Sequence, residues 1–151
     1  MSSIRAILVT TDLSAYSAAA LRYARRFAGK GLRRIYLLHV VEKMPPIPVL
    51  HSVDLTYEDA ERSIWKDREK QLKTFARKYA PRFPKLELAL RKGNPAEEIL
   101  AFARQRKVDL ILMSTHGRTG IGHALMGSVA EKVVRNAQCP VLTLKPKWIQ
   151  K

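Results

Sequence analysis

The chain is poor in several residue classes, and each shortage excludes a class of protein. Its 151 residues contain one cysteine, Cys139, so an internal disulfide framework is excluded. No apolar run approaches the roughly 18 residues that a membrane-spanning helix requires. The N-terminal stretch is too short and too strand-like for a signal peptide. We therefore expect a cytoplasmic protein in a reducing compartment, with Cys139 as a small core or boundary residue rather than a reactive thiol.

Motifs of several enzyme classes are also missing. The segment from Gly122 to Ser128 has the glycine spacing of a Walker A loop, but Ser128 stands where that motif has lysine, so a P-loop triphosphatase is not expected. Neither a Rossmann Gly-x-Gly-x-x-Gly fingerprint nor a Gly-x-Ser-x-Gly nucleophile elbow occurs. The four histidines lack the spacing of metal ligands; they are His39, His51, His116 and His123. We expect neither catalytic residues nor a protein metal site.

Acidic residues are scarce relative to basic ones. Subtracting 13 Asp and Glu from 28 Lys and Arg leaves a net charge of +15. Residues 1–50 contribute +6, residues 51–100 contribute +2 and residues 101–151 contribute +7. Such a field attracts polyanions without sequence preference, yet no RNP motif, zinc finger or aromatic-interleaved basic segment indicates dedicated nucleic-acid binding. Both a solubility charge and a non-specific polyanion contact stay open.

Hydrophobic periodicity predicts alternating strands and helices. With 46% hydrophobic and 27% charged residues, the chain has the composition of one soluble globular domain. Unbroken apolar runs at 4–10, 34–41 and 109–113 predict strands covered on both faces, while 86–91 alternates like an edge strand and 141–144 forms a final apolar strand. Helical spacing occurs at 18–28, 57–79 and 95–107 and from Ser128. The pattern predicts an open, parallel α/β sheet.

Local signals place several boundaries. Asp12 or Ser14 is expected to cap the first helix, and Asn94 the third, with Pro95 at its first position. Three prolines in the segment 44–54 forbid regular structure there, so we expect a loop that covers a site.

A glycine-rich loop follows the fourth predicted strand. Gly117, Gly120 and Gly122 precede Gly127 and Ser128, where the last helical pattern starts. Glycines let the backbone approach an anion, and the first N–H groups of a helix have no internal partner and lie at the positive end of its dipole. Ligands of such sheets bind at the carboxyl ends of the strands. The loop therefore predicts a nucleotide or another phosphorylated ligand.

Taken together, these segments resemble the universal stress protein family over essentially the whole chain. The matching motifs are Ile7–Ser14, Leu38–Val41, Gly93–Ile99, Ser114–Gly120, Gly127–Val134 and Cys139–Leu142. The resemblance implies a Rossmann-like fold of the adenine nucleotide alpha hydrolase type, a single-domain five-stranded sheet with helices on both faces and strand order 3-2-1-4-5. It also implies a family domain at 1–146 with a basic tail at 147–151, a homodimer through strand 141–144, and a role in stress response or signalling.

The resemblance also implies the residues of an adenine nucleotide site. They are Thr10, Thr11, Asp12, Val40, Met113, Ser114, His116, Gly117, Arg118, Gly120, Gly127, Ser128 and Val129. Asp12 and Val40 would lie beside the adenine and ribose. The phosphates would bind backbone N–H groups of Gly117, Gly127, Ser128 and Val129, assisted by the Ser128 hydroxyl and Arg118.

Two departures from the family pattern keep alternatives open. Thr10 replaces a common proline, and Ser114 replaces the first glycine of the ATP-binding pattern. The ligand is expected to be ATP, brought with Mg²⁺ and at most slowly hydrolysed, or a related cyclic nucleotide. The alternative is a dimeric interaction module that binds no nucleotide. Simpler interpretations of three of these residues are a helix cap for Asp12, a solvent-exposed loop charge for Arg118 and a loop-ordering hydrogen bond for His116.

Overall fold

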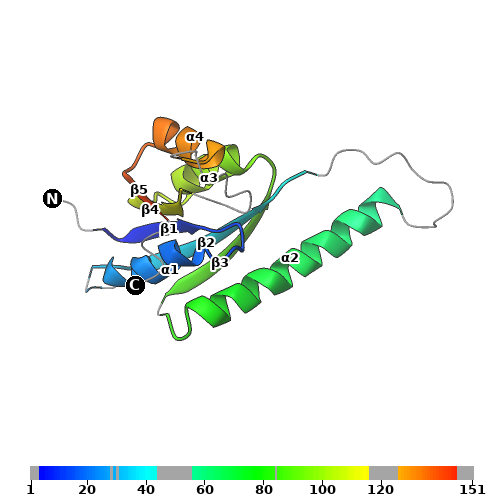
Figure 1. Ribbon diagram of the computed structural model, residues 1–151, viewed down its shortest axis with the longest axis horizontal. Coiled ribbons are helices and arrows are strands. Elements are labelled where there is room, and N and C mark those ends of the chain that lie inside the picture. The colour runs from blue at the N-terminus through cyan, green and yellow to red at the C-terminus, as the bar shows by residue number, and fades with distance from the viewer. Residues whose placement is uncertain are drawn as a thin grey trace.

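The computed structural model describes residues 4–27, 29, 31–43, 56–83, 85–115 and 126–145. In these residues five parallel strands form one sheet in the order β3-β2-β1-β4-β5 (Figure 1). The strands are β1 (Ala6–Thr10), β2 (Arg34–Val41), β3 (Leu86–Lys92), β4 (Leu110–Ser114) and β5 (Val141–Leu144). The predicted α/β class and strand order are confirmed, and β3 and β5 lie at the two edges.

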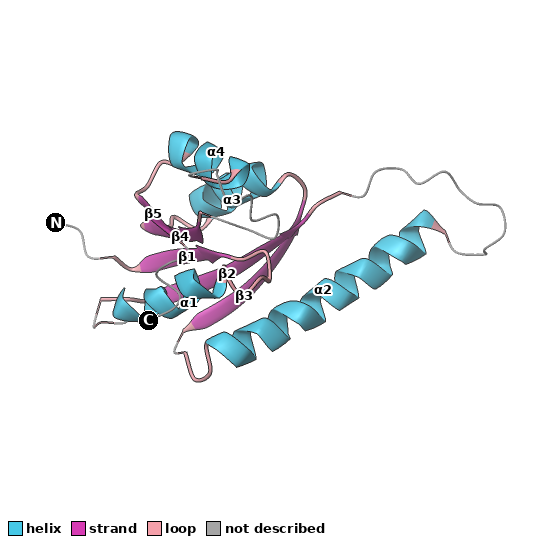
Figure 2. Ribbon diagram, viewed as in Figure 1, coloured by secondary structure: helices cyan, strands magenta, loops and turns pink. Residues whose placement is uncertain are grey.

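Helices cover both faces of the sheet, as predicted (Figure 2). They are α1 (Ala18–Ala24), continued by the 3₁₀ turn η1 (Arg25–Phe27), then α2 (Tyr57–Tyr79), α3 (Pro95–Gln105) and α4 (Ser128–Asn136). One core cluster joins α1 and α2 to the sheet, and the other joins α3 and α4 to its opposite face. The central strands are unbroken apolar runs because both of their faces are buried.

The alternation of β1 shows how each face is filled. Ile7 and Val9 pack in the cluster of α1 and α2, whereas Leu8 packs in the cluster of α3 and α4. All three side chains are fully buried. At the sheet edge, in contrast, Leu88 of β3 is 40% exposed, although Leu86 and Leu90 of the same strand pack against the core. The predicted edge position of β3 is confirmed, but the burial along the strand does not alternate.

The first helix begins at Ala18, where its helical spacing starts, but its predicted cap is wrong. Neither Asp12 nor Ser14 is its N-cap, because α1 starts at Ala18 after Ser17. The Asp12 carboxylate instead accepts the Ser14 N–H at 3.0 Å and the Ser14 hydroxyl at 2.5 Å. These bonds close an Asx turn, and the Ser14 hydroxyl oxygen then accepts the Ser17 N–H at 3.3 Å. Asp12 and Ser14 therefore satisfy N–H groups of the turn before α1 rather than those of the helix itself.

Other boundaries follow the sequence closely. The Asn94 side chain accepts the N–H groups of Ala96 and Glu97 at 3.1 and 3.3 Å, and Pro95 opens α3, so the predicted cap is confirmed. The loop 44–54, the glycine segment 116–125 and the tail 147–151 fall outside the described residues. None of the helices that the structure describes is long and apolar enough to cross a membrane.

Cys139 lies half-buried between α4 and β5. Burial, and secondarily the charge of Asp109, raises the pKa of its thiol. A raised thiol pKa lowers the fraction of nucleophilic thiolate at neutral pH. This environment agrees with the interpretation of Cys139 as a boundary residue.

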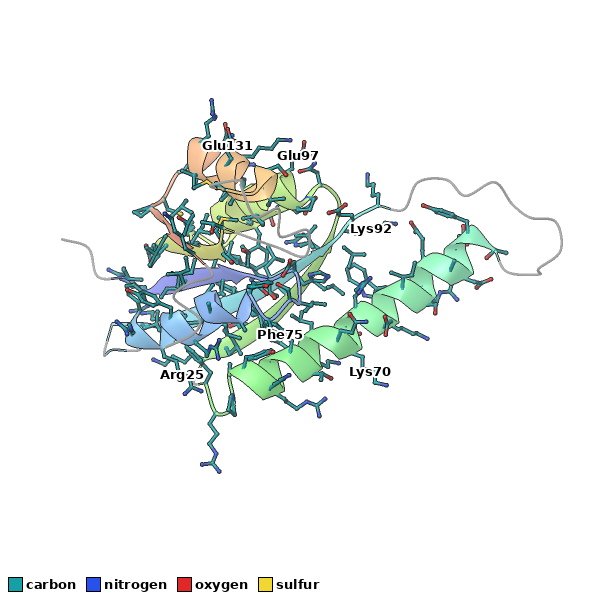
Figure 3. The ribbon with its side chains drawn as sticks, viewed as in Figure 1. Arg25, Lys70, Phe75, Lys92, Glu97 and Glu131 are labelled. Carbon is teal, nitrogen blue, oxygen red and sulfur yellow. The ribbon has the colours of Figure 1, made fainter. Side chains whose placement is uncertain are left out.

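The long helix α2 is anchored through its C-terminal half. Leu72 and Phe75 are buried there, and Figure 3 shows Phe75 between the helix and the sheet. Toward the N-terminus Ile64 is half-buried and Trp65 is 37% exposed. The N-terminal half of α2 therefore extends past the core toward the carboxyl ends of the strands (Figure 1).

This asymmetry predicts different costs for two truncations on one helix. Leu72→Ala is expected to lower the free energy of unfolding by about 2–5 kcal/mol, because it opens a cavity in the core. Ile64→Ala is expected to cost about 1 kcal/mol, since that side chain is already partly hydrated. Urea denaturation of both variants measures the difference. Equal losses would show that α2 is anchored along its whole length.

Candidate functional site

A cavity of about 790 Å³ opens at the carboxyl ends of β1, β2 and β4. Nine of the thirteen residues expected at a nucleotide site line it: Thr10, Thr11, Asp12, Val40, Met113, Ser114, Gly127, Ser128 and Val129. The other four lie outside the described residues: His116, Gly117, Arg118 and Gly120. Segments far apart in the sequence therefore meet at one edge of the sheet, because parallel strands bring their carboxyl ends together.

The turn after β1 holds Asp12 at the cavity wall. Besides its bonds to Ser14, the turn contains a 2.7 Å hydrogen bond between the hydroxyls of Thr11 and Ser17. The Thr11 hydroxyl also accepts the N–H of Leu13, whose φ is 67°. A non-glycine residue in this left-handed region is uncommon and persists where surrounding bonds determine it. Several hydrogen bonds within this turn therefore fix the position of the Asp12 carboxylate.

A buried histidine joins the ends of β1 and β2. His39 is 6% exposed, and its Nδ1 lies 2.8 Å from the Thr11 carbonyl oxygen. A carbonyl oxygen only accepts, so Nδ1 carries the proton and donates. The Thr11 N–H in turn donates to the Leu38 carbonyl at 2.9 Å. The two strand ends that carry Asp12 and Val40 are therefore held in a fixed relation.

The third wall is the start of α4. Gly127 precedes the helix, and a Cβ built on it would lie 3.2 Å from the Thr115 carbonyl oxygen, closer than most side chains tolerate. The Gly127 N–H, expected among the phosphate donors, instead donates to that same carbonyl at 2.8 Å. Ser128 and Val129 are the first helical residues, so their N–H groups have no acceptor inside α4.

Four further lining residues carried no sequence signal for a site. Ile64 and Arg68 of α2 and Pro95 and Ile99 of α3 line the cavity. The Arg68 guanidinium donates to the Gln71 side-chain oxygen at 2.8 Å. In the sequence Arg68 is one of many charges on a mixed helical face. Only the docking angle of α2 brings it to the cavity.

A smaller cavity of about 380 Å³ adjoins the first and shares Val41, Glu42 and Ile64 with it. On its wall Lys92 of β3 forms an ion pair with Glu61 of α2. Hydrogen bonds, first from Lys92 and then from Tyr57, lower the pKa of the Glu61 carboxyl. Glu61 is therefore ionised at neutral pH, and the pair ties the extended half of α2 to the end of β3. Figure 3 shows Lys92 on the sheet side of the helix.

No metal site is apparent in the described part of the chain. No group of three or more His, Cys, Asp or Glu side chains that could hold a metal ion occurs there.

Known proteins resemble this chain in sequence and in structure. The sequence model of the universal stress protein family matches residues 3–145. Universal stress protein MJ0531 of Methanocaldococcus jannaschii is 36% identical over 141 residues, covering 92% of this chain and 81% of that protein. Among solved structures, MJ0577 of the same organism aligns with a TM-score of 0.81 at 26% identity, covering 95% of this chain and 97% of that one.

A more distant likeness concerns the fold alone. A universal stress protein family member from Arabidopsis thaliana, solved with AMP bound, aligns with a TM-score of 0.60 at 19% identity. The alignment covers 93% of this chain and 91% of that one. Since the family match spans nearly all of the sequence and the fold agrees with solved members, this chain belongs to the universal stress protein family.

Proposed function

We propose that this protein binds ATP or a related adenine nucleotide in the cavity at the strand ends, and that it acts in stress response or signalling. One observation carries the proposal: a single cavity joins the Asp12 turn, the end of β2 at Val40 and the first turn of α4. Its volume of about 790 Å³ lies in the range of roughly 300–1,000 Å³ that small-molecule sites occupy.

The chemistry of the walls fits the two ends of such a ligand. Asp12 and Val40 would lie beside the adenine and ribose. The N–H groups of Ser128 and Val129, the Ser128 hydroxyl and the positive end of the α4 dipole would hold phosphate. Gly117 and Arg118 are the further phosphate ligands that the family resemblance proposes. Mg²⁺ would arrive on the phosphates, whose oxygens it prefers as ligands.

Relatives indicate which ligands this fold accommodates. Besides the AMP-bound Arabidopsis protein, a universal stress protein solved in complex with cAMP aligns with a TM-score of 0.64 at 19% identity. Both ligands share an adenine ring and a phosphate. They support an adenine nucleotide as the ligand of this chain, and both ATP and a cyclic nucleotide belong to that class.

The first measurement identifies the ligand directly. Freshly purified protein is denatured, and any released small molecule is identified by chromatography and mass spectrometry. The stripped protein is then titrated with ATP and Mg²⁺. Released adenine nucleotide, or binding in the micromolar range, supports the proposal and means that Ser114 is tolerated at the end of β4. No nucleotide and no binding at millimolar concentration would favour an interaction module without a ligand.

A substitution at Gly127 tests where the phosphates bind. Gly127→Leu is expected to reduce ATP affinity at least tenfold, because its Cβ would press on the Thr115 carbonyl and displace the start of α4. Gly29→Leu is the matched control, since a Cβ there meets nothing within 4 Å. Isothermal titration measures affinity, and circular dichroism checks the fold. Unchanged ATP affinity in a folded Gly127 variant would show that the phosphates do not bind at the start of α4.

We also propose that the protein forms a homodimer through β5. This strand is an edge of the described sheet, and Val141, Leu142 and Thr143 are only half-buried. The Pro140 carbonyl accepts the N–H of Ile111 in β4, and the Leu144 carbonyl accepts the N–H of Thr115, which directly follows β4. Because backbone groups alternate sides along a strand, those of Val141 and Thr143 face the open edge. An exposed apolar edge is suited to pairing with a second copy.

Thr143→Pro tests this interface. It removes an N–H that faces outward without removing a bond to β4, so we expect monomers with the fold retained. Thr143→Ala keeps the N–H and is expected to remain dimeric. Light scattering after size exclusion gives the mass of each. A monomeric wild-type protein at micromolar concentration would contradict the dimer.

A further inference from the structure

A charged surface lies at the amino ends of the strands, away from the cavity. We define the basic corner as the nine exposed residues Arg5, Arg22, Arg25, Arg26, Arg33, Arg34, Lys78, Arg82 and Lys85. Their segments touch one another: the N–H groups of Arg33 and Arg34 donate to the Arg5 carbonyl, and the Lys85 ammonium donates to the Leu32 carbonyl. The corner therefore combines α1, the end of α2 and the starts of three strands.

Aromatic rings and carbonyls hold several of these cations in place. Arg25 donates to the Pro81 carbonyl at 2.9 Å and lies 5.5 Å from the centre of the Phe83 ring. Arg22 and Lys78 lie 5.8 and 5.1 Å from the centre of the Tyr79 ring. Figure 3 shows Arg25 near the turn that follows α2. Cations that are already positioned lose less conformational entropy when they bind an anion.

Few carboxylates offset this charge. Glu87 pairs with Arg34 at 3.4 Å, and the Asp109 carboxylate accepts the backbone N–H groups of Arg5 and Ala6. Nine basic against two acidic groups leave a local charge of +7. Basic residues at helix C-termini are ordinary because they complement the helix dipole. The helix dipole does not explain Arg5, Arg33 or Arg34, because they lie at the starts of strands.

The turn after α2 adds a second indication. Arg82 and Lys85 have φ values of 58° and 60°, a region that glycine adopts at lower cost than other residues. Both positions nevertheless carry long basic side chains. A residue kept in an unfavoured backbone conformation points to a use for its side chain.

We propose that the basic corner binds the phosphate backbone of nucleic acid without reading its sequence. Guanidinium groups, which predominate here, match phosphate geometry with paired donors. The rings of the corner lie beneath the cations, so contacts are to phosphates rather than to stacked bases. A membrane surface fits less well, because the large exposed apolar side chains of the described chain lie elsewhere: Tyr16, Tyr57, Trp65, Leu88 and Val134.

The test compares two triple variants of equal charge. Arg22→Gln, Arg26→Gln and Arg82→Gln neutralise the corner, whereas Lys66→Gln, Lys70→Gln and Lys132→Gln remove three exposed charges elsewhere. Figure 3 shows Lys70 on the outer side of α2. Both proteins keep a net charge of 15 − 3 = +12. Fluorescence anisotropy with a short labelled DNA duplex is recorded from about 50 to 200 mM salt.

The corner variant is expected to lose at least tenfold in affinity at the lower salt concentration. Its slope of log K against log salt should fall by about 2 to 3, because each lost phosphate contact contributes roughly 0.9. The control variant should stay near wild type. Equal losses in both variants, no binding by wild type, or binding to anionic vesicles but not to DNA would overturn the proposal.

Arg82→Gly separates binding from folding. Glycine suits the φ of 58° at this position, so the melting temperature should stay the same or rise while DNA affinity falls. A fall in melting temperature with unchanged DNA affinity would count against the proposal. The ATP affinity of the corner variants is also measured by titration and is expected to match wild type. The DNA proposal and the nucleotide proposal can then fail independently of each other.

Discussion

Parallel pairing of β1 with both β2 and β4 is the constraint on which the rest of the molecule depends. After β1 the chain builds β2 and β3 on one side, then returns to build β4 and β5 on the other. The helices that follow β1 and β4 lie on opposite faces of the sheet, α1 on one and α4 on the other. A crevice at the carboxyl ends of these strands is a geometric consequence of the strand order.

The side chains around the crevice show how a packed scaffold supports an exposed site. Thr11 is bonded to Ser17, Leu13, Leu38 and His39, so the residue beside it, Asp12, stands on backbone that has little freedom. Across the sheet, Thr115 accepts the Gly127 N–H and places the start of α4. Such bracing holds the proposed ligand contacts in position before a ligand arrives, which reduces the entropy lost on binding.

The amino and carboxyl ends of the strands differ in chemistry. At the carboxyl ends, helix N-termini and mixed polar groups surround a cavity. At the amino ends, helix C-termini and strand starts carry many arginines. Parallel strands create this polarity because every N-terminus lies on one side and every C-terminus on the other. The proposed nucleotide cavity and the proposed nucleic-acid surface are therefore separated by the length of the strands (Figure 1).

Local and periodic features could be predicted from the amino-acid sequence. Unbroken apolar runs identified β1, β2 and β4, alternation identified β3 as an edge strand, and Asn94 with Pro95 marked the start of α3, because burial and capping depend on neighbouring residues. The family motifs identified the strand order and the segments that meet at the cavity.

Contacts between distant groups, and the choice among competing hydrogen-bond partners, became visible only in the folded structure. No local pattern showed that Arg68 lines the cavity, since its position follows from the angle at which α2 docks. Nor did the pattern show that the Gly127 N–H donates to the Thr115 carbonyl, or that Asp12 closes an Asx turn instead of capping α1. Each of these is a competition between partners that are close only in the folded chain, and a linear sequence does not contain those distances.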